Sequence, residues 1–362
     1  MQIAFFGSSL LSAWWNGAAT YYRGLIRALH ERGHRITFYE PDALGRQDNR
    51  DMNPPDWARV VVYADDEAAA REMLADARHA DVVIKASGVG VHDALLEAGV
   101  PDLKRADNVV AFWDVDAPAT LERLHDDSDD PFRAQIPRYD LVLTYGGGPR
   151  VVSAYEAFGA RRCVPIYNAL DPETHFPEPT AAEYDVDLAF VGNRLPDREQ
   201  RVERFFLEAV RRCPDRRFLI GGNGWPERNG MPPNVRVLGH IYTRDHNAIN
   251  ASATCVLNIS RDSMARFGYS PATRVFEAAG AGACVVTDAW RGVEHFFEPG
   301  TEILVAEDGA EVADIVRTIT PQQARRIGDA ALARVRAEHT YAQRAVETET
   351  VLRERMQREA PA

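Results

Sequence analysis

Short apolar runs alternate with amphipathic segments along the whole chain. Runs such as 82–85 and 109–113 are mostly apolar, as strands are when both faces of a parallel sheet are covered. Between such runs, segments such as 18–32 and 67–78 place apolar residues at helical spacing. Strands that alternate with helices are typical of βαβ units, so the sequence predicts an α/β fold with parallel sheets.

The expected elements form two series separated by a proline-rich stretch. The expected strands are 3–6, 36–39, 60–63, 82–85, 109–113, 141–144 and 164–167, then 188–191, 218–221, 235–238, 254–259, 284–287 and 303–305. The expected helices include 18–32, 67–78 and 149–158, then 198–212, 243–251, 272–280, 311–319 and a long run from 322 to about 357. Between the series, Pro172, Pro177 and Pro179 exclude a regular helix. We therefore predict two doubly wound domains, 1–167 and 181–340, joined by a linker at 168–180.

Composition and charge narrow the function classes. The 362 residues suit two domains, and a net charge of −12 excludes a broad electrostatic grip on nucleic acid and does not favour an anionic membrane. The four cysteines form no CxxC or zinc-like cluster, which indicates buried thiols in a reducing compartment. The first residues lack signal-peptide features, and no apolar run of about 18 residues could span a bilayer. We expect a cytoplasmic protein.

Small residues surround the start of the first expected helix. Gly7, Ser8 and Ser9 follow the first strand, and Asn16 and Gly17 precede the helix. Glycines beside a helix N-terminus let backbone N–H groups approach an anion, but a tight strand-to-helix turn has the same composition. The segment is not GxGxxG, which argues against a dinucleotide site.

Two carboxylates follow the apolar run 109–113. Asp114 and Asp116 could act as a general base or hold an acceptor, and a DxD pair could also bind a divalent metal. Alternatively, one of the two caps the helix that Pro118 begins. We favour the catalytic or acceptor role.

Arginines follow a glycine turn at the start of the second series. Gly192, Asn193 and Arg194 come directly after strand 188–191, and Arg198 and Arg201 lie in the next helix. A strand, a glycine turn and arginines at a helix N-terminus are typical of a diphosphate site. The alternative is a solvated basic helix face.

The most specific motif surrounds the expected helix 272–280. Pro271 stands at its start, and Glu277 lies three residues after Arg274 on the same helical face. A carboxylate there can accept hydrogen bonds from two ribose hydroxyls while Arg274 and the helix N-terminus meet phosphate. The alternative is an internal Arg274–Glu277 pair that braces the turn.

These motifs resemble the retaining GT-B-fold glycosyltransferases of the family-4 type, and more closely their spore-maturation (CgeB-like) branch. The resemblance covers most of the chain. It rests on the glycine loop through the Gly33–His34 turn, the Asn168–Asp171 segment with Phe176–Pro177, the Gly192–Arg194 turn, Gly239–His240, and Phe276–Ala278 with Val285–Val286.

The resemblance implies a GT-B fold, in which two Rossmann-like domains face each other across a cleft. Residues 1–167 would bind the acceptor, 181–340 would bind the nucleotide-sugar donor, and a C-terminal helix at 341–362 would pack back across the domains. We expect no cofactor, metal, nucleic-acid partner or membrane span, and UDP as the nucleotide of the donor.

The resemblance also assigns donor-site residues and exposes departures. Glu277 corresponds to the second glutamate of the family's E-x7-E motif, which binds the ribose, while Tyr269 replaces the first glutamate. Trp113 replaces a family histidine, and no lysine accompanies the phosphate arginine. The expected donor-binding residues are therefore Gly17, Arg194, Arg201, His240, Tyr269, Ser270, Arg274 and Glu277.

The sequence thus predicts a metal-independent hexosyltransferase that moves a sugar from a nucleoside diphosphate sugar to a hydroxyl of a small molecule or glycan. Asp114 or Asp116 would orient the acceptor or take its proton. Two alternatives stay open: a GT-B-fold nucleotide-sugar epimerase, and a non-catalytic nucleotide-sugar-binding protein.

Overall fold

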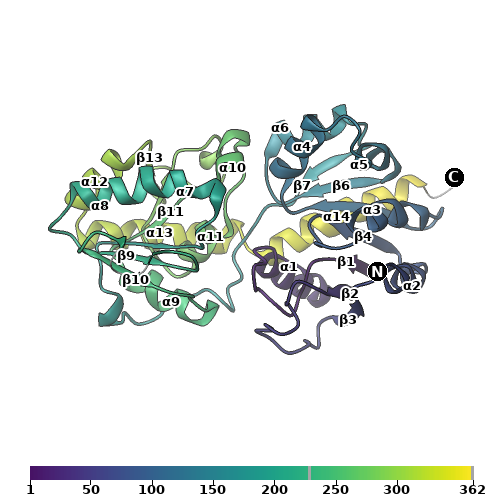
Figure 1. Ribbon diagram of the computed structural model, residues 1–362, viewed down its shortest axis with the longest axis horizontal. Coiled ribbons are helices and arrows are strands. Elements are labelled where there is room, and N and C mark those ends of the chain that lie inside the picture. The colour runs from purple at the N-terminus through teal and green to yellow at the C-terminus, as the bar shows by residue number, and fades with distance from the viewer. Residues whose placement is uncertain (227–229, 360–362) are drawn as a thin grey trace. The chain divides into compact units, whose positions relative to one another are not determined.

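The computed structural model of the protein describes residues 1–226 and 230–359 and divides into two compact units (Figure 1). Unit 1 comprises Met1–Tyr167 together with Tyr341–Ala362, and unit 2 comprises Asn168–Thr340. Residues 360–362, the end of the expected helix 341–362, lie outside the described residues. No helix within the described residues is both long and apolar enough to cross a membrane.

Unit 1 is built on a seven-stranded parallel sheet with the order β3-β2-β1-β4-β5-β6-β7. Its strands are β1 (Gln2–Phe6), β2 (Arg35–Asp42), β3 (Arg59–Ala64), β4 (Val82–Ala86), β5 (Val109–Asp114), β6 (Leu141–Thr144) and β7 (Cys163–Pro165). Its helices are α1 (Ala19–Glu31), α2 (Glu67–Ala77), α3 (Asp93–Asp102), α4 (Ala117–Asp126), α5 (Phe132–Gln135), α6 (Gly148–Ala157) and α14 (Tyr341–Glu359), with a 3-10 turn at Ile136–Arg138. All residues of β4 and β5 are buried, as expected for the centre of a doubly wound sheet.

Unit 2 is built on a six-stranded parallel sheet with the order β10-β9-β8-β11-β12-β13. Its strands are β8 (Leu188–Val191), β9 (Phe218–Gly221), β10 (Val235–Leu238), β11 (Cys255–Asn258), β12 (Val285–Asp288) and β13 (Leu304–Ala306). Its helices are α7 (Pro196–Val202), α8 (Glu208–Arg212), α9 (Thr243–Ser252), α10 (Asp262–Phe267), α11 (Thr273–Gly280), α12 (Gly309–Thr318) and α13 (Pro321–Glu338). A π-helical turn at Glu203–Leu207 joins α7 to α8, and 3-10 turns cover Ala182–Tyr184 and Val293–His295.

The predicted fold class is confirmed, since both sheets are parallel and doubly wound. Strands β6, β8, β9 and β10 have the predicted bounds, whereas β7 ends at Pro165, before the predicted 167. The predicted helix from 322 to about 357 is wrong, because it is two helices. The chain breaks at His339 and Thr340, where the Leu170 N–H donates to the His339 carbonyl at 2.7 Å and Leu170 pairs with Thr340.

The C-terminal helix α14 packs against α1 within unit 1 (Figure 1). The Tyr341 ring lies over Gly24, where an added Cβ would stand 2.1 Å from Tyr341 Cδ2. Directly after the end of α1, Arg32 forms an ion pair of 2.5 Å with Glu349. The close approach of the two helices therefore requires glycine at position 24.

Candidate functional site

Three glycine turns lie together at the carboxyl edge of the unit 2 sheet. The Gly192 N–H donates to the Gly221 carbonyl at 2.8 Å, and the Gly222 N–H donates to the Gly239 carbonyl at 2.9 Å. Gly222 has a φ of 124°, and a Cβ there would stand 2.4 Å from the Gly192 carbonyl oxygen. The turns after β8, β9 and β10 thus form one connected floor, and position 222 tolerates glycine alone.

Arg194 lies on the rim of this floor. Its N–H donates to the Asn223 carbonyl and the Asn223 N–H donates to Asn193 Oδ1, both at 2.9 Å, so the turn is fixed from both sides. The Arg194 side chain is 41% exposed and forms an ion pair with Glu199, which raises the pKa of the guanidinium. An anionic ligand at this position would compete with Glu199 for Arg194.

His240 stands beside the same turn. Its Nδ1 lies 3.2 Å from Asn223 Nδ2, and its ring meets Tyr242 edge to face with the centroids 4.6 Å apart. His240 is exposed. Asn223 therefore connects His240 to the Arg194 turn, which brings two predicted donor-site residues together.

Helix α11 carries Arg274 and Glu277 into the interior of unit 2. Glu277 is 6% exposed, with Oε2 lying 3.9 Å from Arg274 Nη1 and Oε1 lying 4.0 Å from His175 Nε2. The internal Arg274–Glu277 contact, one of the two interpretations of the motif, is therefore present. Arg274 Nη1 is buried and donates no hydrogen bond to any described residue, so its contact with Glu277 is an ion pair without a hydrogen bond.

Two histidines accompany this pair. His175 Nε2 lies 3.4 Å from His246 Nδ1. Burial lowers the pKa of His175, against the opposing charge of Glu277, and burial together with the positive charge of Arg274 lowers the pKa of His246 well below its usual value. Both rings are therefore neutral at pH 7.

His175, His246 and Glu277 also have the residue types of a metal site. One ligand atom from each lies within 4.8 Å of the other two. However, the Arg274 guanidinium lies against the same carboxylate, and its positive charge opposes a cation there. We assign this cluster no metal.

Tyr269 and Ser270 lie in the loop before α11. Tyr269 has a φ of 48°, its N–H donates to the Arg291 carbonyl at 2.7 Å, and its ring lies against Gly292. Ser270 is 3% exposed and its hydroxyl donates to the Gly268 carbonyl at 3.0 Å. The loop is therefore held in a strained conformation by its own contacts.

Arg201 is held by a carboxylate that the sequence analysis missed. Its Nη2 lies 2.5 Å from Asp288 Oδ2, and Asp288 is fully buried at the end of β12, where it also accepts from the Ser260 N–H at 2.9 Å. The sequence feature that could have identified Asp288 is its position, as an acidic residue at the end of an apolar strand. Asp288 holds Arg201 between α7 and the sheet.

In unit 1, Asp114 lies in the interior at the end of β5. It is fully buried, and its oxygens accept from Ser87 Oγ at 2.7 Å, from Thr120 Oγ1 at 3.1 Å and from the Tyr155 hydroxyl. Burial raises the pKa of Asp114, against these hydrogen bonds. Its geometry is that of a carboxylate that joins β4, β5, α4 and α6.

The other two predicted residues of unit 1 are more accessible. Asp116 is half-buried at the N-cap position of α4, where its side chain makes no capping hydrogen bond. Gly17 is exposed two residues before α1, with no atom within 4 Å of an added Cβ. Gly17 can therefore be approached by a ligand, whereas Asp116 Oδ1 is itself buried.

A groove of about 980 Å³ runs beside the edge of the unit 2 sheet. Its lining includes Gly222, Asn223 and Gly239 together with residues of β10, but neither Arg194 nor Glu277. The groove therefore overlaps the predicted donor site only at the glycine turns.

Residues 198–350 match a family model described as glycosyl transferase-like. No curated protein matches the chain. Among solved structures, the chain is similar to the Anabaena protein HepE in complex with UDP and glucose, at 14% identity and a TM-score of 0.69 over 98% of this chain and 100% of that one.

Two further structures have the same architecture. Sucrose-phosphate synthase from Thermosynechococcus elongatus matches at 13% identity and a TM-score of 0.70, over 98% of each chain. An E. coli trehalose-6-phosphate protein bound with UDP-2-fluoro glucose matches at 12% identity and a TM-score of 0.67, over 99% of each chain. With its two parallel α/β sheets, this chain has the GT-B-like fold of these glycosyltransferase structures, and its residues 198–350 are similar to the glycosyl transferase-like family.

Proposed function

We propose that this protein transfers a hexosyl group from a nucleoside diphosphate sugar to a hydroxyl of an acceptor. The observation that carries the proposal is the connected floor of glycine turns at the carboxyl edge of the unit 2 sheet, with Arg194 on its rim. Open α/β sheets bind nucleotides at this edge. The Anabaena and E. coli structures of the same fold hold UDP or a UDP sugar, which supports UDP as the nucleotide here.

The donor would be held by residues of several loops. Arg194 would exchange Glu199 for the diphosphate, and the buried, unsatisfied Nη1 of Arg274 would meet the same group. Glu277 would accept hydrogen bonds from the ribose hydroxyls. His240 would lie beside the base, Tyr269 and Ser270 at the sugar, and Arg201 near the diphosphate.

The chemistry would be electrostatic. Negative charge grows on the leaving diphosphate in the transition state, and fixed cations and N–H groups stabilise it without a metal. On the acceptor side, Asp116 is the better base, because Asp114 is fully buried with both oxygens engaged.

Calorimetric titration with UDP and UDP-glucose, followed by transfer assays across a nucleotide-sugar panel, tests the proposal. We expect Arg194→Ala and Glu277→Ala each to weaken donor binding by about 10- to 100-fold, since a charge-assisted hydrogen bond contributes about 1.5–3 kcal/mol. Arg211→Ala is the matched control, because Arg211 is exposed and pairs with Glu203 on the helix surface. Unchanged donor affinity in both site variants would remove this site assignment.

A further inference from the structure

Two exposed tryptophans stand on the loop that follows β1. Trp14 is 37% exposed and Trp15 is 57% exposed. Their rings meet edge to face at an interplanar angle of 87°, with the centroids 6.4 Å apart, so they form an aromatic corner. An indole is among the largest apolar groups a fold can bury, and leaving two in water forgoes that stabilisation.

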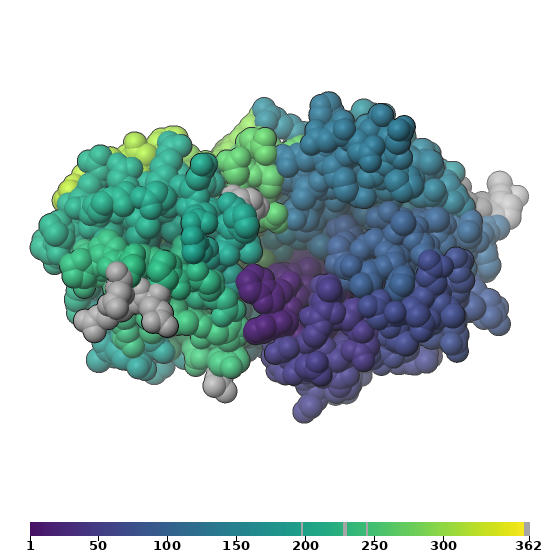
Figure 2. Space-filling model, viewed as in Figure 1, coloured from purple at the N-terminus to yellow at the C-terminus, as the bar shows by residue number. Residues whose placement is uncertain are grey.

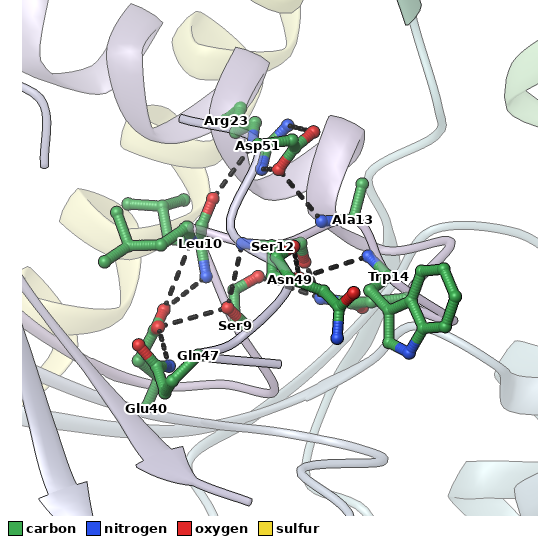
Figure 3. A network of polar contacts seen from close by, with 12 residues as sticks. Ser9, Leu10, Ser12, Ala13, Trp14, Arg23, Glu40, Gln47, Asn49 and Asp51 are labelled. Carbon is green, nitrogen blue, oxygen red and sulfur yellow. Dashed lines mark hydrogen bonds and ion pairs between the residues drawn. The ribbon is translucent and has the colours of Figure 1, made fainter. Parts of the chain in front are cut away.

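A buried glutamate holds the start of this loop (Figure 3). Glu40 is fully buried in β2, and its carboxylate accepts from the Leu10 N–H at 2.5 Å, from Ser9 Oγ at 3.1 Å and from Gln47 Nε2 at 2.7 Å. A carboxylate is costly to bury unless hydrogen bonds satisfy it. Here the loop itself provides those bonds, which fixes its backbone.

A second clamp holds the end of the loop. Asp51 accepts from the Ala13 N–H at 3.1 Å and forms two hydrogen bonds with Arg23, at 2.6 and 3.0 Å. The Ser12 hydroxyl donates to the Asn49 carbonyl at 2.7 Å and accepts from the Trp14 N–H at 3.2 Å. Figure 3 shows the Trp14 indole pointing away from this polar network.

The loop also carries backbone strain. Trp15 has a φ of 47°, in the left-handed region that bulky side chains rarely adopt. Such a residue costs on the order of 1–3 kcal/mol and persists only where the surrounding contacts impose it. Strain at an exposed, clamped tryptophan points to a role in binding.

The position of the loop fits that role. β1 lies between β2 and β4. The strand order runs in one direction from β1 through β2 to β3 and in the other from β4 to β7, so the switch point lies between β1 and β4. Doubly wound sheets bind ligands at this point. Arg46 Nη1 donates to the Ser8 carbonyl after β1 at 3.1 Å and to the Val89 carbonyl after β4 at 2.7 Å. The aromatic corner therefore lies on the loop that leaves the unit 1 sheet at this switch point, and the purple N-terminal part of the chain reaches the surface in Figure 2.

We infer that Trp14 and Trp15 bind a sugar ring of the acceptor by stacking, an inference that rests on the proposed function. The C–H face of a pyranose ring packs on an indole, while its hydroxyls suit the exposed Asn49 and Asp51 beside the loop. The net charge of the protein argues against other ligands that could stack on an indole. A net charge of −12 disfavours both phosphate-bearing nucleic acid and an anionic membrane surface.

Saturation-transfer NMR without donor tests the inference, using methyl glucopyranoside, methyl galactopyranoside, methyl mannopyranoside and their disaccharides as probes. We expect transfer to the ring C–H protons of at least one probe, and at least a tenfold loss of its affinity in Trp14→Ala and Trp15→Gly. Glycine relieves the strain at position 15, so Trp15→Gly folds normally and removes only the indole. Val346→Ala, which trims another exposed apolar residue, leaves sugar binding unchanged.

Calorimetry with UDP on the same variants separates the two proposals. Unchanged UDP affinity together with lost sugar binding is the expected result. Sugar binding that survives in both tryptophan variants, or binding of phosphatidylglycerol vesicles in place of sugars, would overturn the aromatic site. If wild-type protein binds a sugar but no nucleotide, the transferase proposal fails while the tryptophan site stands as a sugar-binding surface.

Discussion

In unit 1 the carboxylates near the strand ends face inward, whereas the turns after β8, β9 and β10 of unit 2 carry glycines and side chains that reach the surface. Glu40 and Asp114 are both fully buried and satisfied by their own unit. In unit 2, Arg194 and His240 are exposed on a floor of glycine turns. The same edge of a parallel sheet thus holds satisfied, buried carboxylates at β2 and β5 of unit 1 and an exposed floor of glycine turns at β8, β9 and β10 of unit 2.

The comparison teaches that an acidic residue at a strand end is an ambiguous signal. Asp114 and Asp116 are two residues apart, yet one lies in the interior and the other is half-buried at a helix start. What separates them is the set of hydroxyl donors that packing brings to Asp114. Substitutions can test this division between structural and ligand-facing positions.

The largest expected effect is that of Asp114→Ala. Removing this carboxylate leaves the hydroxyls of Ser87, Thr120 and Tyr155 buried without their acceptor, so we expect the free energy of unfolding to fall by about 3–5 kcal/mol. Denaturant unfolding of unit 1 measures this loss. Asp116→Ala is the control, with an expected loss below about 1 kcal/mol. If Asp114→Ala keeps wild-type stability but loses transfer activity, Asp114 belongs to the chemistry and our comparison is wrong.

A smaller effect is expected from Gly222→Ala. The new Cβ would meet the Gly192 carbonyl oxygen, and alanine is strained at a φ of 124°, so the connected floor must shift. We expect a loss of about 2–3 kcal/mol in stability, measured by urea unfolding, and weaker UDP binding by calorimetry. Gly239→Ala serves as the control, since nothing lies within 4 Å of its added Cβ. Equal behaviour of the two variants would mean that the glycine floor is not the ligand-facing surface.

The smallest expected effect is a pH dependence of the stability of unit 2 that comes from its two buried histidines. Burial lowers the pKa of His175 and of His246 in the folded state, whereas an unfolded histidine titrates at about 6.5. The unfolded state therefore takes up protons first as the pH falls below about 6.5, and the free energy of unfolding decreases.

Urea unfolding between pH 8 and pH 5 measures this decrease in the free energy of unfolding. We expect the decrease to be smaller in His246→Gln than in wild type. The difference between the two should be smaller than the loss of stability in Gly222→Ala. His125→Gln, at an exposed position, is the control. A slope that is the same in His246→Gln and wild type would contradict the buried, neutral state of this pair.

Much of the fold could be predicted from the sequence because it depends on local pattern. Continuous apolar runs such as β8 and β9 are bounded by polar or glycine residues, so their limits are visible in the sequence. The break between α13 and α14 is not, because it depends on Leu170, which lies far away in sequence and bonds His339. Helix-forming residues stand on both sides of that break.

The candidate site was less accessible to sequence reasoning. The glycine turn with Arg194 was predicted, because a glycine directly after an apolar strand indicates a tight turn. The burial of Asp114 was not, because Ser87 and Tyr155, which enclose it, lie 27 and 41 residues away. Glu40 was missed altogether, although a glutamate directly after the mostly apolar residues 36–39 of β2 is a usable signal of a buried network.

Helix α14 makes the order of synthesis matter for this protein. The segment translated after unit 2 completes the unit whose larger part is translated before it, since Tyr341 covers Gly24 and Glu349 pairs with Arg32. Unit 2 is continuous in sequence and can close on its own while α14 is still being made. Unit 1 must wait with the apolar face of α1 uncovered, and during that interval the nascent chain is open to chaperones and to misassembly.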